Sequence, residues 1–431
     1  MDLFILTRFI LFLSFFMKSI HCQYSESQES GHNRNAPDKE LTTEEFQLIF
    51  HQSQTVDIEY DFINITTEMI ETERKVSFTI DGKEYHLSLT PAASQSVLPY
   101  GTKIKSAIWW TDNDTHIHEE DYSDERWDSR AIYENLEIMA TILVRTENGT
   151  SYYDGVFVKY SNEGVRSLPG RLMNIYGANY HFVYDSNGSV YDVVLNGQDE
   201  PAVPADMASK IIFYSETPCT CRLLIIQDLL MKTSRRLSSI STIFWNAVNL
   251  RFRPVQHPKV NIIITGIVIA KNEAAFQHVY RARYSKNSKL VHTGRVIDNG
   301  RYFFGTNFDP YYDNYDASFT MASMDDPTGK GGATVIGGIC SSSNNIAYIR
   351  DVGSYSGVKV ATHELGHLLN GQHDSDTTCS EKINDNIYTI MAKQGSTKAS
   401  KFVWSSCTLT AFANFSKTTS AACLKDTYRK Q

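Results

Sequence analysis

In the first half of the chain, from residue 41 to about residue 215, apolar and polar residues alternate in short runs. Strict alternation over four to eight residues places every second side chain on one face, which is the pattern of half-buried β-strands. Pairs that favour tight turns, among them Asp81-Gly82 and Asn148-Gly149, separate the runs. The pattern therefore predicts a mostly β region, with strands over residues 76–80, 85–89, 138–144 and 180–184.

The pattern changes after residue 215. Residues 223–226 and 260–270 are apolar runs, which favour fully buried strands, and residues 238–250 between them suit a helix. A strand, a helix and a second strand in that order are typical of an α/β domain. The stretch 196–204, NGQDEPAVP, has the composition of a linker. We therefore expect a mostly β domain over 23–215 and an α/β domain over 216–431.

The N-terminus has the pattern of a secretory signal peptide. Residues 1–17 are mostly apolar, Arg8 interrupts them, and a polar stretch begins at Gln23. Such a run is too short to span a membrane comfortably, and a cleavage site near residue 22 follows it. A signal anchor is the alternative. No later apolar run reaches membrane length. We expect residues 1–22 to be removed and the protein to be secreted, with no membrane partner.

Composition narrows the class further. Of the 431 residues, 42% are hydrophobic, which is enough to bury sizeable cores and excludes a disordered chain. The formal net charge is −8, so the chain has no basic excess of the kind that binding to phosphates requires. We therefore expect no nucleic-acid partner.

Cysteines and sequons also favour export. Removal of Cys22 with the signal peptide leaves six cysteines, all in the C-terminal half. An even number in an exported chain suggests disulfides. Five Asn-x-Ser/Thr sequons are candidate glycosylation sites, at Asn64, Asn113, Asn148, Asn187 and Asn414.

The candidate chemistry lies in residues 362–374, THELGHLLNGQHD. His363 and His367 are four residues apart, so on a helix their imidazoles lie on one face and can bind one Zn2+. Glu364 would lie beside this metal, where its carboxylate can take a proton from water. The spacing predicts a zinc site with a general base.

A helix break follows the second histidine. Asn370 and Gly371 tolerate left-handed backbone angles better than other residues, so the helix can end there and His373 can return as a third ligand. Three imidazoles leave one coordination position open, which is typical of a catalytic zinc site. The alternative, a helix whose histidines bind no metal, would need this whole spacing to arise by chance.

These residues resemble the extended zinc signature of the metzincin metalloproteases. Asp374, directly after the third histidine, resembles the adamalysin branch, also called reprolysin or ADAM-type. Met391, in the segment YTIMA, resembles the methionine turn that lies beneath the metal in this family. The family normally has glycine where this chain has Asn370. Because Asn is the least costly substitute in that conformation, we expect the turn to survive.

The resemblance implies a fold, an α/β metzincin catalytic domain with a mixed sheet and helices, preceded by a mostly β prodomain over residues 23–215. It implies the disulfides Cys340–Cys423 and Cys379–Cys407. It also implies a cleft-edge strand that pairs with extended substrate, formed by Ala333, Thr334, Val335, Ile336 and Gly337. An ordinary hairpin is the alternative for that strand. A Ca2+ site is common in the family, but no ligands for it can be assigned here.

Two cysteines, Cys219 and Cys221, are left over by the family pairing. They can bond to each other as a structural disulfide. Alternatively, one of them can act as a latency thiol that occupies the open zinc position, as in the cysteine switch of the resembling family. Both alternatives remain open at this point.

The combined hypothesis is a monomeric, secreted zinc endopeptidase, made as a proenzyme, that acts on extended polypeptides. It resembles the short exported enzymes of arthropod venoms and saliva. His363, His367 and His373 would hold the zinc, Glu364 would act as the base, and Met391 would support the site. The alternative is a non-catalytic secreted binding protein that keeps zinc for structure. A third possibility gives the N-terminal domain its own role after release.

Overall fold

The structure is a computed structural model that describes most of the chain beyond residue 60. The described residues are 41–43, 45, 60–80, 82–92, 97, 103–109, 115–119, 132–147, 150–158, 162–168, 170–177, 179–185, 191–195, 219–228, 237–270, 272–307, 315–351, 355–374, 387–393 and 401–425. The chain divides into two compact units, Met1–Thr42 and Thr43–Gln431, and both sheets described below belong to the second unit. The expected signal peptide and the expected linker lie outside the described residues.

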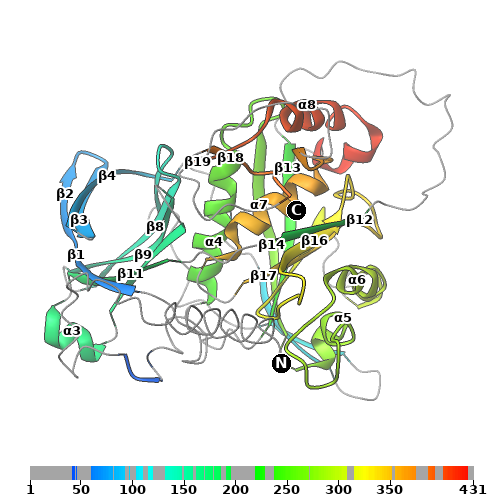
Figure 1. Cartoon of the computed structure of the whole chain (residues 1–431), viewed down its shortest axis with the longest axis horizontal. Coiled ribbons are helices and arrows are strands. Elements are labelled where there is room, and N and C mark those ends of the chain that lie inside the picture. The colour runs from blue at the N-terminus through cyan, green and yellow to red at the C-terminus, as the bar shows by residue number, and fades with distance from the viewer. Residues whose placement is uncertain are drawn as a thin grey trace, which may run out of the picture. The chain divides into compact units, whose positions relative to one another are not determined.

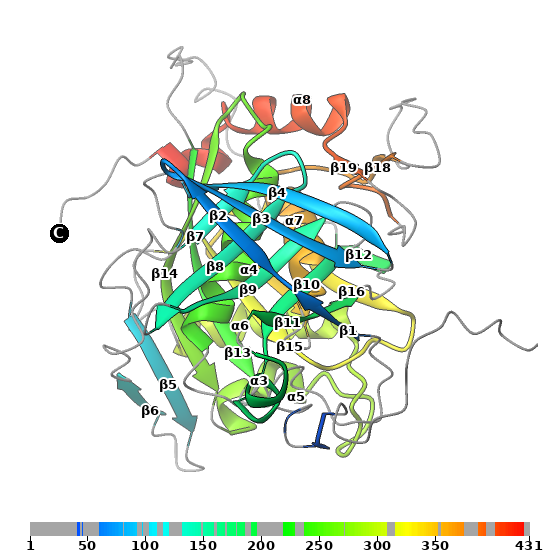
Figure 2. The ribbon, with the colours of Figure 1, turned by 90° about the vertical axis from the view of Figure 1, so that its left-hand side faces the viewer.

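The first sheet is antiparallel, with nine described strands in the order β1-β11-β10-β9-β8-β7-β4-β3-β2 (Figures 1 and 2). Its strands are β1 Tyr60–Asn64, β2 Thr66–Ile70, β3 Glu73–Ile80, β4 Lys83–Pro91, β7 Ile132–Asn135, β8 Ala140–Glu147, β9 Thr150–Val158, β10 Asn162–Ser167 and β11 Tyr180–Asp185. The helix α3 (Gly170–Tyr176) connects β10 and β11. The sheet confirms the mostly β prediction. The strand expected over 138–144 begins later, at Ala140, because residues 136–139 form a turn.

The second sheet is mixed, with eight described strands in the order β12-β16-β17-β15-β13-β14-β5-β6. The strands are β5 Lys103–Trp109, β6 Thr115–Glu119, β12 Tyr191–Leu195, β13 Cys219–Asp228, β14 Val260–Ala270, β15 Ala317–Ala322, β16 Lys330–Val335 and β17 Ile346–Arg350. The predicted strands over 223–226 and 260–270 are β13 and β14, which are parallel neighbours. A small two-stranded sheet joins β18 (Ile387–Thr389) to β19 (Lys401–Val403).

Three strands of the second sheet come from the segment expected to form the N-terminal domain. β5 pairs in parallel with β14, β6 pairs with β5, and β12 pairs in parallel with β16. The N-terminal segment therefore builds one sheet of its own and also both outer margins of the other sheet. The expected boundary at residue 215 lies outside the described residues and remains a prediction.

Helices cover both faces of the second sheet. In β17 the side chains alternate: Ala347 and Ile349 belong to the core that contains α4 and α7, whereas Ile346 and Tyr348 belong to the core that contains α5 and α6. The helices are α4 Leu237–Phe252, α5 Gln277–Tyr280, α6 Thr293–Asn307, α7 Gly357–Leu368 and α8 Ser406–Phe415, with 3-10 turns at Ala274–Phe276 and Thr419–Lys425. This arrangement confirms the predicted α/β domain.

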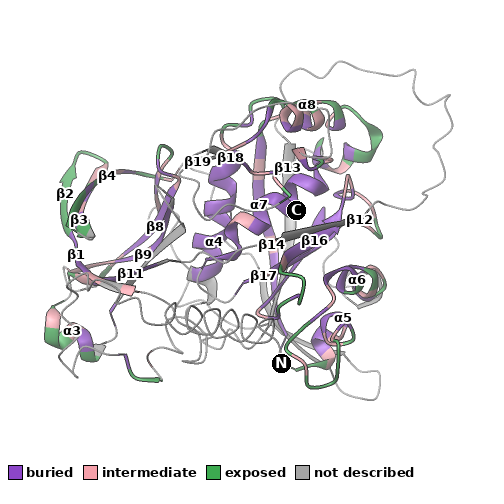
Figure 3. Cartoon of the chain, viewed as in Figure 1, coloured by how far each residue is buried: buried purple, intermediate pink, exposed green. Residues whose placement is uncertain are grey.

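The helix α4, predicted over 238–250, is buried on every side (Figure 3). Each residue from Ile240 to Phe252 is buried, including the charged Arg251. Burial lowers the pKa of the Arg251 guanidinium to about 10, so it stays charged at neutral pH, and it donates a hydrogen bond to the Ala247 carbonyl at 2.8 Å. A helix that is buried around its whole circumference belongs to a core rather than to a surface.

A histidine, His278, is buried beside the second sheet. His278 in α5 is 1% exposed, stacks on Phe303 with 4.5 Å between ring centroids, and its Nε2 lies 2.9 Å from Thr320 Oγ1. Burial disfavours the charged imidazolium and lowers the pKa of His278 to about 3. The unfolded chain takes up a proton near pH 6.5, whereas the folded chain does not.

We predict that the free energy of unfolding falls as the pH drops from about 6.5 to about 3, by up to about 1.4 kcal/mol per pH unit from this residue. His278→Gln, which can keep a hydrogen bond to Thr320, should remove this part of the slope. Urea denaturation of both chains across this pH range, with a chelator present throughout, measures the difference. Parallel stability curves for the two chains would contradict the prediction.

Candidate metal centre

The helix α7, which carries the predicted motif, is anchored at its first turn by Asp351. The Asp351 carboxylate accepts hydrogen bonds from Gly357 N at 3.0 Å and from Ser356 Oγ at 3.4 Å. A carboxylate at this end pairs with backbone N–H groups that have no partner within the helix, and it complements the helix dipole. Every residue of α7 except Lys359 is buried, so its motif side chains lie inside the protein (Figure 3).

The end of α7 is a two-bond turn with a left-handed residue. Asn370 has φ of +71°, its N–H donates to the His367 carbonyl at 2.8 Å, and Gly371 N donates to the Gly366 carbonyl at 2.8 Å. This pair of bonds is the Schellman arrangement that closes a helix and turns the chain back. It confirms the helix break expected at Asn370-Gly371, with Asn370 in the strained position.

The turn brings the three predicted histidines together. His363, His367 and His373 are all buried, and each offers a ring nitrogen that lies within 4.8 Å of the other two. The Nε2 atoms of His367 and His373 are 3.3 Å apart. Two ligands of a tetrahedral zinc ion, each 2.0–2.1 Å from the metal, would be separated by about 3.3–3.4 Å. The spacing of this pair therefore fits zinc.

Backbone carbonyls orient two of the rings. The His363 Nδ1 faces the Ile390 carbonyl at 2.5 Å, and the His367 Nδ1 faces the Gly371 carbonyl at 2.6 Å. A carbonyl can only accept a hydrogen bond, so each Nδ1 carries the proton and each Nε2 keeps its lone pair for a metal. The chemistry of this donor set matches a three-histidine zinc site.

Glu364 lies on the same helix, between the two helical ligands, and it is fully buried. The neighbouring strand β16 passes very close to it. A Cβ added to Gly332 would overlap Glu364 Oε1 and would lie 2.6 Å from Val360 Cγ1. Only glycine leaves room for the carboxylate at this point. Sequence reasoning missed Gly332, because nothing near it in the chain indicates a close approach to α7.

Met391, expected to form a methionine turn, is fully buried and packs against α7. Its sulfur would lie 2.6 Å from a Cβ placed on Gly366, so that glycine allows Met391 to pack directly against α7. The preceding residue, Ile390, supplies the carbonyl that faces His363. The Met391 carbonyl accepts a hydrogen bond from Asp374 N at 3.1 Å, which ties the turn to the histidine loop.

The Asp374 carboxylate joins the histidine loop to α8. Its Oδ1 accepts hydrogen bonds from Ser405 Oγ at 2.5 Å and from Thr408 Oγ1 at 3.3 Å. Ser405 also caps α8 by accepting from Thr408 N. The sequence singled out Asp374 as a mark of a family branch, but it offered no sign that residues 31 positions later would hold it.

The expected substrate-binding strand is present, with two differences. The strand β16 runs over Lys330–Val335, so Ala333, Thr334 and Val335 lie in it, whereas Ile336 and Gly337 form the turn that follows. Gly337 has φ of +68°, which ends the strand, and its N–H donates to the His367 carbonyl at 2.8 Å.

The second difference concerns the edge of the sheet. β16 pairs antiparallel with β17 on one side, and on its other side it pairs with β12. The strand expected at the margin is therefore covered by residues Tyr191–Leu195 of the N-terminal segment. Asp192 of β12 is the register partner of Gly332, which places the β12 backbone beside the position that touches Glu364.

The structure contains a disulfide between Cys340 and Cys423, with Cα atoms 5.7 Å apart. It connects the loop after β16 to the final 3-10 turn. Cys407 is also disulfide-bonded. Cys379 lies outside the described residues, so the pairing of Cys379 with Cys407 remains a prediction.

Cys219 and Cys221 belong to β13, where they pair in register with Val260 and Ile262 of β14. Residues two apart on a strand have Cα atoms about 6.6–6.8 Å apart, at the upper limit of disulfide geometry. The side chains of both residues lie outside the described part of the structure, so the structural disulfide and the latency thiol both remain predictions.

Two of the predicted glycosylation sites, Asn64 and Asn414, are described, and both are exposed. Asn113, Asn148 and Asn187 lie outside the described residues. Within the described ranges, no helix has the length and apolar character needed to cross a membrane.

Comparisons with known proteins agree with this site. A family model described as Metallo-peptidase family M12, Reprolysin_5, matches residues 251–403, which include α7 and Met391. Venom metalloproteinase 3 of Eulophus pennicornis is 90% identical over 414 residues, covering 95% of this chain and 100% of that protein. Venom metalloproteinase 2 of Eulophus pennicornis is 50% identical over 417 residues, covering 94% of this chain and 100% of that protein.

Among solved structures, metalloproteinase-II from Bacteroides fragilis matches 80% of this chain and 89% of its own, with a TM-score of 0.40 and 12% sequence identity. We base no conclusion about this chain on a structural similarity this low. The sequence relatives cover nearly the whole chain and include the site. This chain belongs to the M12 reprolysin family of zinc metallopeptidases.

Proposed function

We propose that this metalloproteinase is a secreted zinc endopeptidase, made as a proenzyme, that hydrolyses peptide bonds in extended extracellular polypeptides. One observation carries the proposal. Glu364 is a buried carboxylate on α7, between two histidines whose ring nitrogens lie close enough to that of His373 to bind one metal ion. The strand β16 runs beside Glu364. A purely structural zinc site has no need of a base there and is normally closed by a fourth protein ligand.

His363, His367 and His373 would hold the zinc, and Met391 would support them from below. Bound there, zinc supplies Lewis acidity that polarises the scissile carbonyl and acidifies water. Glu364 accepts the proton of the attacking water and passes it to the leaving amine. Burial of all four side chains keeps these groups in a low-dielectric environment, where their electrostatic interactions are strong.

The edge of β16 that β12 covers in the intact chain would bind the substrate once β12 has left it. Backbone groups of a strand edge can hold any extended peptide, while side-chain pockets select among sequences. Ala333, Thr334 and Val335 lie in the strand close to Glu364, and Ile336 and Gly337 continue it into the turn. This placement supports a peptide backbone running alongside the base.

The proenzyme state follows from the strand that covers this edge. An edge strand can pair with one further strand, and β12 already pairs with β16 over five positions. β12 thus competes with substrate for the same backbone groups. Latency through this pairing would need no cysteine.

The signal-peptide pattern and the names of the two venom relatives support secretion, and we include venom as the source in the proposal. Glycans on the five sequons and a monomeric state belong to the same proposal. Metal analysis of the purified protein should show one zinc per chain. The same measurement would show whether Ca2+ is also bound.

The first prediction from this proposal concerns Glu364, the proposed base. Glu364→Gln keeps the size of the side chain but cannot accept a proton, so cleavage of denatured casein by the activated protein should fall by about 10²–10⁴-fold. Zinc content should be unchanged, and a chelator should abolish cleavage by the wild type. The matched control is Glu137→Gln, at an exposed turn, which should cleave at the wild-type rate. Equal cleavage by wild type and Glu364→Gln would remove Glu364 from the mechanism.

The second prediction concerns Gly332. Gly332→Ala places a methyl group against Glu364 Oε1 and should displace the carboxylate. Because a misplaced acid–base group transfers protons less efficiently, kcat should fall by at least about tenfold. The zinc content should be unchanged. Adding Gly332→Ala to Glu364→Gln should cause little further loss, because the two changes act on one group. Fully additive losses, or loss of zinc in Gly332→Ala, would assign glycine a structural role instead.

The third prediction concerns β12. Val193→Pro with Val194→Pro removes two backbone donors from this strand and should raise casein cleavage by the intact chain at least about tenfold. Val193→Thr with Val194→Thr keeps the backbone and should stay latent. Ile117→Pro, in β6 at the opposite margin of the same sheet, controls for strand disruption and should also stay latent. Equal activity of all four intact chains, checked by mass before and after the assay, would show that β12 does not inhibit.

A further inference from the structure

The helix α4 is shared between the two sheets. On one side it packs against β14 and α7, and on the other side it packs against β8 and β9 of the nine-stranded sheet. Ile132, Leu143 and Val156 from that sheet belong to the same buried cluster as Phe244 and Val248 of α4. The complete burial of α4 therefore depends on residues from both halves of the chain.

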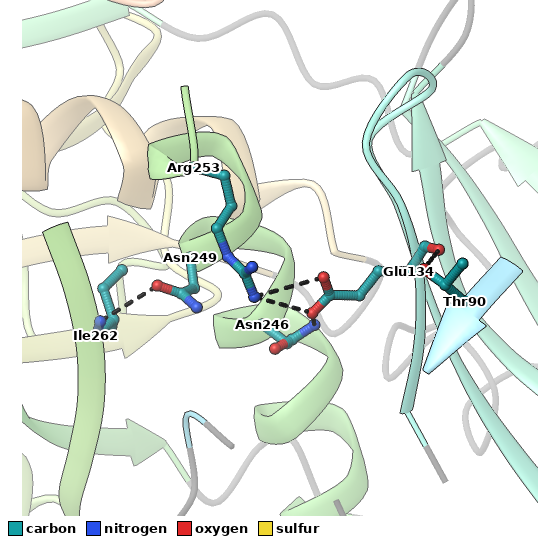
Figure 4. A network of polar contacts seen from close by, with 6 residues as sticks. All are labelled: Thr90, Glu134, Asn246, Asn249, Arg253 and Ile262. Carbon is teal, nitrogen blue, oxygen red and sulfur yellow. Dashed lines mark hydrogen bonds and ion pairs between the residues drawn. The ribbon is translucent and has the colours of Figure 1, made fainter. Parts of the chain in front are cut away.

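A buried polar network reinforces this contact (Figure 4). Glu134 of β7 is 6% exposed, and its Oε1 accepts hydrogen bonds from Asn246 Nδ2 at 3.3 Å and from Arg253 Nη2 at 3.4 Å. On the next face of the helix, Asn249 Oδ1 accepts from Ile262 N of β14 at 3.2 Å. Burying a carboxylate this deeply is costly unless a cation lies beside it, so moving β7 away from Arg253 would be unfavourable. The network therefore opposes separation of the two sheets that pack on α4.

Backbone pairing adds a third connection. β5 runs in parallel with β14 over five positions, and Ile264 N of β14 donates to the Val97 carbonyl at 2.7 Å. The N-terminal partners in these bonds, β5 and Val97, precede β12 in the chain. They do not depend on β12 or on the margin of the sheet beside the metal centre.

We propose that the N-terminal region is a permanent, noncovalent subunit of the enzyme, and that cutting the chain between Leu195 and Cys219 does not release it. Its partner is the C-terminal portion of the same chain, through α4 and β14. Residues 23–218 contain no cysteine, so no disulfide can hold the two pieces together once the expected signal peptide, with Cys22, is removed. Release would expose the apolar outer side of α4 and leave Arg253 without Glu134.

This inference goes beyond the proposed function, because it separates the opening of the β16 edge from the release of the N-terminal region. Activation requires only that β12 leave β16, while the nine-stranded sheet, β5 and β6 stay in place. The active enzyme would therefore contain two chains. It also argues against a separate role for a freely released N-terminal domain.

The test uses the full chain with a single site for a specific protease inserted between Leu195 and Cys219. Glu364→Gln in the same chain prevents self-digestion. After the cut, denaturing gels should show two pieces, and native size-exclusion chromatography should show one particle with the mass of the intact chain. Two soluble pieces that elute separately would overturn the proposal. No proteolytic activity is measured, so this result does not depend on the proposed function.

Charge variants test the α4 interface itself. Glu134→Arg places two cations together, and the cut pieces should then separate at least about tenfold faster on dilution. Glu134→Arg with Arg253→Glu restores the pair and should restore slow separation. Glu137→Arg, two residues past the end of β7 and exposed, is the matched control and should behave as the parent. If all variants separate at the parent rate, the network does not hold the subunit. If Glu134→Arg fails to fold, the elution of the cut parent still decides.

Discussion

Three neutral imidazoles must direct one nitrogen each at the same buried metal position. The rest of the catalytic domain is arranged around this constraint. α7 can supply two of them, but the third requires the chain to stop its helix and reverse within six residues of His367. Asn370 and Gly371 achieve this with two backbone hydrogen bonds. The same turn offers the Gly371 carbonyl to His367, so helix ending and ligand orientation are one structural event.

Support for the three histidines comes from two further segments of the chain. The turn at Ile390 and Met391 orients His363 and fills the space beside Gly366. Asp374 fixes the histidine loop to the start of α8. Each contact uses a backbone carbonyl, a small residue or a short polar bridge, and the carboxylate of Asp374 is the charged group among them. A site held in this way can keep its geometry when the strand beside it changes partner.

The strand β16 connects chemistry with control. One of its residues, Gly332, lies against Glu364, the proposed base, and its outer edge is the proposed binding site for a peptide backbone. In the intact chain that edge is paired with β12. The N-terminal region is bound at the other side of the domain through α4 and β5, which share none of these groups. The proposed inhibition and the proposed cohesion therefore rest on different contacts, and one can be lost without the other.

The sequence by itself determined the local features: the strand and helix segments, the spacing of His363 and His367, and the break at Asn370. These follow from the periods of helix and strand and from the backbone preferences of single residues, which act over a few positions. Only the tertiary structure decided that β5, β6 and β12 join the second sheet, that Gly332 meets Glu364, and that Asp374 meets Ser405. Such contacts join residues from about 30 to more than 150 positions apart, and their stability arises from pairing and burial that no local pattern records.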